Sequence, residues 1–277
     1  MTATLHSAKS TALGIKMKSR LIFLALAGVF FVCPARADIS ATIAKVKPSV
    51  VIVGTFKSTN SPRFGLRGTG FVVANAKLGS SNLVITNAHV LQQPAEQDLE
   101  ASLAIQFRVG QNEWQMRPAV VVEVDRVHDL ALLRFEGPAI AALSVRDSDS
   151  VLEGQSVAFM GFPIGGALGF SPVTHRGMIS SITAAALPTA TAQQLNERAI
   201  RNLRGGSAFN VFQLDATAYP GNSGGPMFDP DTGEVLGVVN MVFIKGTRES
   251  ALTNPSGISY AIPSGYILQL MQRSKSN

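Results

Sequence analysis

The sequence predicts an all-β protein, and two observations support this fold class. Short runs rich in β-branched and aromatic residues recur from Pro48 onward, and Gly, Pro, Asn, Asp and Ser separate them. The chain has 277 residues, of which 46% are hydrophobic, so it can bury a sizeable core. Many short strands at this spacing are typical of a β-barrel or a β-sandwich.

The expected strands, in chain order, are Ser49–Phe56, Gly68–Val73, Asn82–Val90, Leu103–Val109, Ala119–Asp125, Leu130–Phe135, Ser156–Phe162, His175–Ile182, Phe209–Asp215, Val235–Phe243 and Gly257–Pro263. Two stretches favour helix instead. One is Thr191–Arg204, which is rich in good helix formers, and the other is the tail from Ser264, which follows Pro263.

The N-terminus, residues 1–37, is typical of a secretory signal peptide. Lys18 and Arg20 precede the apolar run Leu21–Val32, and a small-x-small site ends at Ala37. This run is shorter than the roughly 20 apolar residues that span a bilayer. We therefore expect export, to a bacterial periplasm or to the medium, and a processed chain without a stable membrane anchor that begins at Asp38. Met17 is an alternative start, and a retained N-terminal anchor is the alternative outcome.

The positive net charge belongs to this leader. The chain carries +6, but five basic residues and no acidic ones precede Asp38, so the remainder is nearly balanced and we expect no nucleic-acid partner. The single cysteine, Cys33, also lies in the leader, and Val32 before it argues against lipidation. The processed chain then has no disulfide or thiolate metal site, and we expect no metal and no cofactor. Asp229–Glu234 is too short for a calcium loop and predicts a hairpin turn.

One serine is surrounded by glycines in the stretch GNSGG, Gly221–Gly225. Nucleophilic serine chemistry needs an uncovered hydroxyl and backbone N–H donors aimed at the developing oxyanion. We expect Ser223 to be the nucleophile and Gly221, Asn222 and Ser223 to form the oxyanion hole, with the amides of Gly221 and Ser223 as donors. Gly224 and Gly225 are expected to leave room for the incoming carbonyl. A glycine-rich hairpin turn is the alternative interpretation.

Two upstream residues complete a candidate triad. His89 follows an apolar strand, and Asp129 opens another, so an imidazole and a carboxylate are expected at strand ends. The order His, Asp, Ser is that of chymotrypsin and differs from the subtilisin order. Taken singly, His89 could be an ordinary strand-end histidine and Asp129 an ordinary acid before a strand. The neighbouring His128 is expected to be an exposed edge residue, and His175 to have a surface or loop-packing role.

Further motifs resemble those of trypsin-like serine proteases of the bacterial HtrA kind. GTGFVV, GFPIG, VTHRGMISSI and YAIP are similar to stretches of that family, and the resemblance covers roughly Ile43–Leu270. It implies two six-stranded antiparallel β-barrels with the active site in the cleft between them, and a C-terminal helix. Residues 38–147 would form the barrel with His89 and Asp129, and residues 148–277 the barrel with Ser223.

The sequence departs from this family in three ways. No PDZ domain is expected, because only a few residues follow the terminal helix. The stretch AYPG, Ala218–Gly221, stands where the family usually has a polar pair, and the fixed φ of Pro220 would stiffen the oxyanion loop. The stretch Thr183–Ala208 is longer than usual and partly helical, and it would lie near the specificity loops.

Activation is expected to differ from that of pancreatic-type zymogens. Those proteins become active when a freed N-terminal amine pairs with an aspartate beside the serine. Asn222 stands at that position and is neutral, so we expect activity without that step.

The residues that face a substrate are expected to be uncharged. Thr217, six residues before the serine, offers no charge for Lys or Arg, and Val239, Asn240 and Met241 would form the pocket wall. We expect an endopeptidase that cleaves polypeptides after small or medium apolar P1 residues. The alternatives are a latent binding module or chaperone with a collapsed oxyanion loop, and an esterase. The sequence leaves the oligomeric state open.

Overall fold

The computed structural model describes residues 38–74, 80–91, 101–110, 113–163, 170–185, 209–241 and 257–276. All of these residues belong to the unit Ala37–Asn277. The expected leader, with Cys33, and the expected helix Thr191–Arg204 lie outside the described residues.

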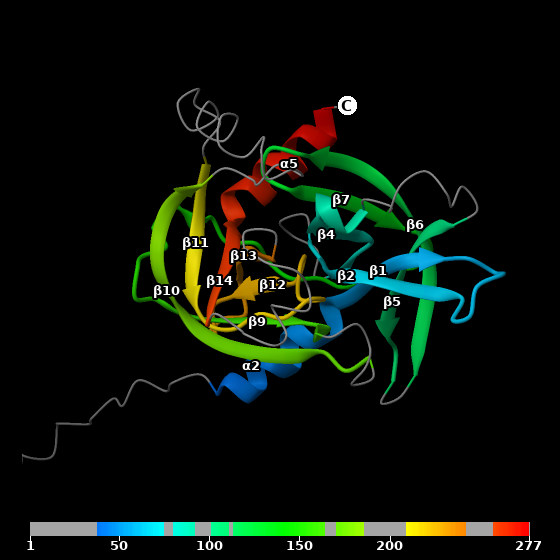
Figure 1. The fold of residues 1–277 in the computed structure, drawn as a ribbon, viewed down its shortest axis with the longest axis horizontal. Helices are drawn as coiled ribbons and strands as arrows, with labels where there is room; N and C mark the ends of the chain where they lie inside the picture. The colour runs from blue at the N-terminus through cyan, green and yellow to red at the C-terminus, as the bar shows by residue number, and fades with distance from the viewer. Residues whose placement is uncertain are drawn as a thin grey trace, which may run out of the picture. The chain divides into compact units, whose positions relative to one another are not determined.

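In the described residues, six strands close into a first barrel in the order β1-β2-β4-β7-β6-β5, each strand antiparallel to its neighbours (Figure 1). Their bounds are β1 Val50–Phe56, β2 Phe64–Val72, β4 Leu83–Asn87, β5 Ser102–Arg108, β6 Trp114–Asp125 and β7 Leu130–Phe135. Val51 and Val53 of β1 pack with Ile105 and Phe135 in one core cluster. Alternate side chains of these strands therefore fill the barrel.

A second closed antiparallel barrel follows in the order β10-β11-β14-β13-β12-β9 within the described part of the chain. Its strands are β9 Ser156–Gly161, β10 Val173–Ala185, β11 Phe209–Asp215, β12 Pro226–Phe228, β13 Val235–Asn240 and β14 Ile258–Pro263. Phe159, Leu214, Leu236 and Ala261 pack together in its own core cluster. The expected fold class, two six-stranded barrels, is confirmed.

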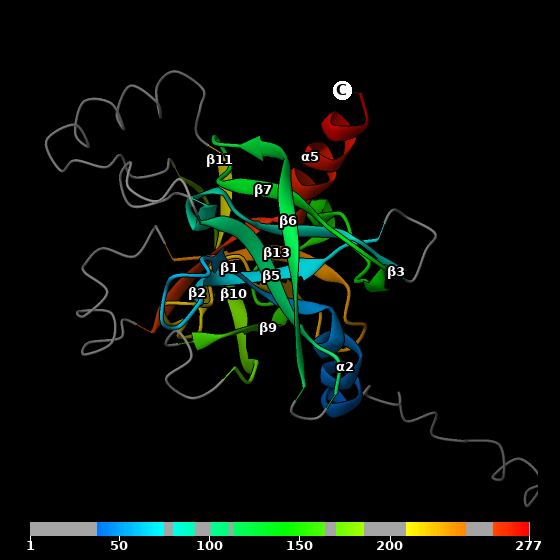
Figure 2. The ribbon, with the colours of Figure 1, turned by 90° about the vertical axis from the view of Figure 1, so that its right-hand side faces the viewer.

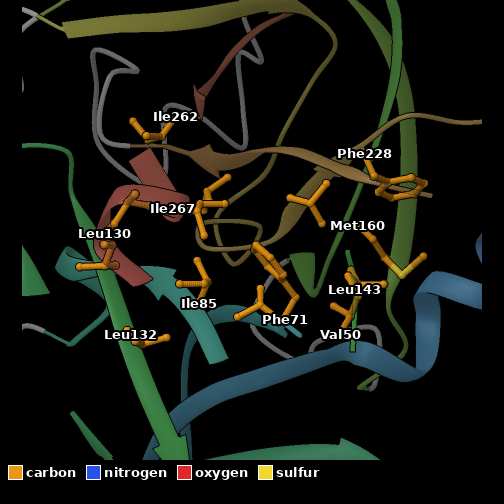
Figure 3. Packing of buried hydrophobic residues seen from close by; sticks show 14 of the residues in the cluster. Val50, Phe71, Ile85, Leu130, Leu132, Leu143, Met160, Phe228, Ile262 and Ile267 are labelled. Atoms are coloured by element: carbon orange, nitrogen blue, oxygen red, sulfur yellow. The ribbon is translucent and has the colours of Figure 1, made fainter. Parts of the chain in front are cut away.

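A third hydrophobic cluster joins the two barrels (Figure 3). Phe71 and Ile85 of the first barrel pack in it with Met160, Phe228 and Ile262 of the second. Each such side chain contributes about 1.5–3 kcal/mol on full burial. Because the barrels share this core, residues that each contributes to a common site are held in a fixed relation.

The run VVIV at the start of β1 is buried on both faces. Val51 and Val53 face the interior of the first barrel, whereas Val50 and Ile52 belong to the cluster between the barrels. This explains why an antiparallel strand has an uninterrupted apolar run instead of an alternating one.

Within the described ranges, two helices flank the barrels. The helix α2, Ile39–Val46, was not expected from the sequence; the Asp38 side chain caps it by accepting a hydrogen bond from Ser40 N at 2.9 Å. The predicted terminal helix is confirmed as α5, Ser264–Ser276, and it packs on β6, β7, β13 and β14 (Figure 2). No helix of the described residues is long and apolar enough to cross a membrane.

The remaining elements are short. They are β3 Ser80–Ser81, β8 Ile140–Ala141 and 3-10 turns at Lys47–Ser49, Ala88–Leu91 and Ser148–Ser150. Asp229–Glu234 forms the predicted hairpin turn between β12 and β13, where the Asp229 carboxylate accepts hydrogen bonds from Asp231 N and Thr232 N. Four strands begin earlier than expected, because their antiparallel pairing continues past the expected starts: β2 at Phe64, β5 at Ser102, β6 at Trp114 and β10 at Val173.

Candidate active site

His89 and Asp129 meet at one end of the first barrel. His89 lies in the 3-10 turn after β4, Asp129 lies in the turn between β6 and β7, and β4 pairs with β7. His89 Nδ1 is 2.5 Å from Asp129 Oδ2, and His89 N donates to Asp129 Oδ1 at 2.8 Å. The carboxylate favours a proton on Nδ1 and leaves Nε2 as the basic nitrogen of the ring.

The backbone of Asp129 is in the left-handed region, with φ of 52°. A residue other than glycine is uncommon there, and the conformation costs about 1–2 kcal/mol. The Asp129 carbonyl accepts hydrogen bonds from Ala88 N at 3.1 Å and from Asn87 Nδ2 at 3.0 Å. These bonds offset the cost and join the Asp129 turn to the residues directly before His89.

Asn240 of the second barrel also contacts this carboxylate. Its Nδ2 donates to Asp129 Oδ2 at 2.7 Å, and its side chain is fully buried. The buried Asp129 carboxylate therefore accepts three hydrogen bonds, two from His89 and one from Asn240. Charge-assisted hydrogen bonds of this kind are strong and fix the position of the carboxylate.

Ser223 is brought to the same end of the first barrel by β2. Thr69 N donates to the Ser223 carbonyl at 2.8 Å. A Cβ built on Gly68 would lie 2.7 Å from Val90, the residue after His89, and 3.0 Å from the Ser223 carbonyl oxygen. Ser223 is 6% exposed, and its hydroxyl has no hydrogen-bond partner among the described residues. The backbone of Ser223 thus lies close to the His89 turn, and the described part of the chain leaves its hydroxyl without a partner.

The four residues before Ser223 form a type II turn. Asn222 N donates to the Tyr219 carbonyl at 2.9 Å, Pro220 occupies the second position, and Gly221 occupies the third with φ of 105°. A type II turn requires a positive φ at its third position, which explains the glycine. Thr69 Oγ1 donates to the Gly221 carbonyl at 2.6 Å and anchors the turn to the first barrel.

The backbone amides of Gly221–Gly225, here called the serine loop, divide into those with a hydrogen-bond acceptor and those without one. Those of Asn222, Gly224 and Gly225 donate to the carbonyls of Tyr219, Val239 and Asn222. Those of Gly221 and Ser223 have no acceptor among the described residues. Most buried backbone N–H groups are paired, so the two unpaired amides are donors free to receive an acceptor, and they are the pair that the sequence singled out.

The expectation for Gly224 and Gly225 is wrong. Neither keeps space open for a substrate, because a Cβ on Gly224 would overlap the Thr69 carbonyl and Thr86 Oγ1, and one on Gly225 would overlap the Met160 carbonyl. Gly224 also has φ of 85°. These two glycines let the serine loop pack against the backbones of both barrels.

A family model described as a trypsin-like peptidase domain matches residues 68–238. The chain belongs to this family. The match includes the serine loop, the His89 turn and the Asp129 turn.

Individual relatives are HtrA-type proteases. The chain is 29% identical over 216 residues to "Serine protease HTRA2, mitochondrial" of Drosophila grimshawi, covering 78% of this chain and 41% of the relative. It is 28% identical over 238 residues to "Serine protease HTRA4" of Mus musculus, covering 84% of this chain and 40% of the relative. The chain thus spans about two fifths of the length of these relatives.

The solved structure of the HtrA-type protease AlgW with a tripeptide has a similar fold. Its TM-score is 0.57 at 22% identity, and the match covers 85% of this chain and 62% of that one. A variant of the same protease, AlgWS227A with a tripeptide, matches with a TM-score of 0.58 at 22% identity, over 85% of this chain and 63% of that one.

Asn222, within this peptidase domain, packs against His175. Asn222 is fully buried, its Nδ2 lies 3.5 Å from His175 Nε2, and its Oδ1 has no partner in the described segments. The His175 ring stacks on Phe159 at 4.8 Å and lies 6.0 Å from the ring of Tyr219. Burial lowers the pKa of His175 below its ordinary value. The expected loop-packing role fits this position, because His175 lies next to Tyr219 and Asn222, the first and last residues of the type II turn.

The four expected substrate-facing residues differ in their exposure. Thr217 and Met241 are half-buried. Val239 packs in the core of the second barrel, and the Asn240 side chain is bound to Asp129. The backbone of Val239 is hydrogen-bonded to Gly224 and Gly225, so neither side chain of Val239 and Asn240 is left to face a ligand, while Thr217 and Met241 are partly exposed.

The expectation for His128 is wrong. It is not an exposed edge residue, because its side chain is 17% exposed, its Nδ1 lies 2.7 Å from Asp125 Oδ2 and its ring stacks on Tyr266. The described residues contain no cluster of three or more His, Cys, Asp or Glu side chains that could hold a metal ion.

Sequence reasoning missed Thr69 and Asn87 and assigned Asn240 to a different role. Thr69 lies between two glycines in GTG, and Asn87 lies two residues before His89. The signal that could have found them is a polar residue within a predicted apolar strand. A polar side chain that is buried in such a strand needs a specific hydrogen-bond partner.

Proposed function

We propose that this chain is an exported serine endopeptidase that hydrolyses peptide bonds through an acyl-enzyme, with Ser223, His89 and Asp129 as its catalytic triad. The proposal rests on which backbone amides of the serine loop have a hydrogen-bond acceptor. Among the described residues, the amides on either side of Asn222 have no acceptor and the Ser223 hydroxyl has no partner, whereas the neighbouring amides are paired and the His89 ring is bound to the Asp129 carboxylate.

In the first half of the reaction, Ser223 Oγ attacks the peptide carbonyl and His89 Nε2 takes its proton. The amides of Gly221 and Ser223 donate to the oxyanion, each such donor contributing on the order of 10²–10³ in rate. His89 then gives the proton to the leaving amine, and the acyl group stays on Ser223. Asp129 holds the ring and stabilises the imidazolium.

In the second half, His89 takes a proton from water, which attacks the acyl carbonyl. The oxyanion is held by the same two amides, and Ser223 regains its proton as the product acid leaves. Every group in this cycle belongs to the chain, so no cofactor is required.

The substrates we propose are polypeptides with a small or medium apolar P1 residue. Thr217 and Met241 support this, since both are uncharged and half-buried. Thr217 precedes Ser223 by six residues, and Met241 follows β13, whose Val239 is hydrogen-bonded to Gly224 and Gly225. Differences of one methylene are worth only about 1–3 kcal/mol, so the preference is broad.

The turn geometry supports an active enzyme over a latent binding module. A collapsed oxyanion loop would turn the Pro220–Gly221 peptide over, whereas Gly221 has the positive φ of a type II turn and no described residue accepts from its amide. Pro220 suits the second position of this turn, so proline and glycine both favour it.

The test is cleavage of an unstructured protein and of a peptide mixture by the purified chain, with cut sites read by mass spectrometry. We expect cuts after Val, Ala or Leu that vanish in Ser223→Ala and persist in Ser180→Ala, a serine on the exposed side of β10. Cleavage that survives Ser223→Ala would contradict the proposed nucleophile. Cuts confined to sites after Lys or Arg would contradict the proposed pocket. N-terminal sequencing of the exported chain tests processing before Asp38.

A further inference from the structure

We infer that Arg273 and Tyr266 of α5 position the catalytic aspartate, by clamping the β6–β7 turn through Asp125 and His128. The inference rests on the proposed triad, and it assigns α5 a part in catalysis that lies outside the reacting groups. Arg273 and Tyr266 are positioning residues, because their contacts in the described part of the chain are with Asp125, His128 and residues of β11 and not with His89 or Ser223.

Asp125 fixes the backbone that leads into Asp129. It is the last residue of β6 and pairs with Leu130, so residues 126–129 form the connection between the strands. Asp125 Oδ1 accepts hydrogen bonds from Val127 N at 3.1 Å and His128 N at 3.0 Å. The two residues directly before Asp129 are thereby held by one side chain.

The Asp125 carboxylate is in turn held by α5. It is buried, and its Oδ2 accepts from Arg273 Nη2 and lies 2.7 Å from His128 Nδ1. Burial raises the pKa of Asp125, but the hydrogen bonds from His128 and Arg273 outweigh burial and hold the pKa well below its usual range. Asp125 is therefore a charged group whose position depends on its partners.

Tyr266 provides the second contact of the clamp. Its ring stacks on His128 at 4.0 Å with an angle of 18°, and its hydroxyl accepts a hydrogen bond from Asn210 N. Tyr266 and Arg273 are seven residues apart, which places them on one face of the helix two turns apart. One helix face thus contacts the connection between β6 and β7 at two points.

The strain at Asp129 makes this support necessary. A left-handed residue that is not glycine persists only where its surroundings over-determine it. Asn87 and Ala88 hold the Asp129 carbonyl from the His89 side, and the clamp holds the residues before it. A shift of the carboxylate by a fraction of an ångström would lengthen its bonds to His89.

The experiment compares Arg273→Met, which keeps the length and helix propensity of the side chain, with Arg273→Lys. A misplacement of about 1 Å costs up to about 10²-fold in rate, so we expect kcat of Arg273→Met to fall about 10- to 100-fold with little change in KM. Lysine should restore most of the activity, because Asp125 accepts a single hydrogen bond from Arg273 and does not need a bidentate partner.

Arg146→Met is the matched control. Arg146 also binds two carboxylates, Asp229 at 3.1 Å and Glu234 at 3.3 Å; its side chain is 31% exposed against 46% for Arg273, and neither carboxylate belongs to the β6–β7 connection. We expect it to lower the melting temperature without changing kcat. An equal loss of kcat in both variants would mean that the Arg273 contacts only stabilise the fold, and this result would overturn the inference.

Proton NMR separates this inference from the proposed function. The His89 Nδ1–H signal, assigned by its loss in Asp129→Asn, should shift or broaden in Arg273→Met and remain unchanged in Arg146→Met. An unchanged signal with unchanged kcat in Arg273→Met overturns the clamp. If the wild-type chain cleaves no peptide, the proposed function fails, while the NMR signal still tests the clamp.

Discussion

Replacing Thr69 by valine tests whether the first barrel anchors the type II turn Tyr219–Asn222, which carries a proposed oxyanion donor of the second barrel. Thr69 Oγ1 donates to the Gly221 carbonyl at 2.6 Å and accepts from Phe162 N at 3.1 Å, and the side chain is fully buried. Valine fills the same volume but has no hydroxyl, so both groups lose their partner.

The magnitude follows from these two bonds. A buried polar group left without a partner costs about 1–3 kcal/mol, so two of them lower the free energy of unfolding by about 2–6 kcal/mol. The Gly221 amide loses its fixed direction when the turn loses its anchor. Since one oxyanion donor is worth about 10²–10³ in rate, that range is the upper limit of the fall in kcat.

The assay is steady-state peptide cleavage beside denaturant unfolding of the wild type, Thr69→Val and Thr69→Ser. Serine keeps the hydroxyl and loses only the methyl group, so we expect it to retain kcat. If Thr69→Val is destabilised as calculated but turns over at the wild-type rate, Thr69 stabilises the fold without positioning the turn, and the reasoning is refuted.

Three further predictions concern other parts of the site. Asp129→Asn should lower kcat about 10⁴-fold in single-turnover assays while circular dichroism stays unchanged; a mild effect would identify another residue as the acid of the triad. Gly224→Ala should lower the free energy of unfolding by more than the roughly 1–3 kcal/mol of its positive φ alone, because its Cβ would overlap Thr69; chemical denaturation measures this, and a neutral effect would contradict the packing. His175 has a lowered pKa in the folded state, so its contribution to stability is complete above its unfolded pKa of about 6.5 and is lost as the pH falls through the folded pKa. Melting temperatures between about pH 7.5 and pH 5 should therefore fall less in His175→Phe, which keeps a ring beside Phe159, than in the wild type, and equal slopes would count against it.

The fold class could be predicted because the runs that form strands, and the turn residues that bound them, are local features of the sequence. Apolar runs such as Val50–Val53 and Leu130–Leu133 are bounded by turn residues, and each became a buried strand. The helix Ile39–Val46 was missed because most of its stability comes from contacts with the distant hairpin turn: Lys45 donates to the Thr232 carbonyl and Val46 is fully buried.

The proposed site could be predicted as residue types and order, but not as a network. A histidine, an acid and a glycine-flanked serine are visible in one dimension. The Asn240–Asp129 contact joins residues 111 positions apart and the Thr69–Gly221 contact joins residues 152 apart, so no local pattern encodes them. His128 was misjudged for the same reason, since Tyr266, which covers it, lies on the terminal helix.

The central claim is that Ser223 is a nucleophile activated by His89. The most direct test is labelling of the purified chain with a fluorescent fluorophosphonate, followed by mass spectrometry of the labelled peptide. We predict label on Ser223 in the wild type, and none on Ser223→Ala or His89→Ala at the same concentration. A folded wild-type chain that stays unlabelled, or one labelled at a different residue, would contradict the account.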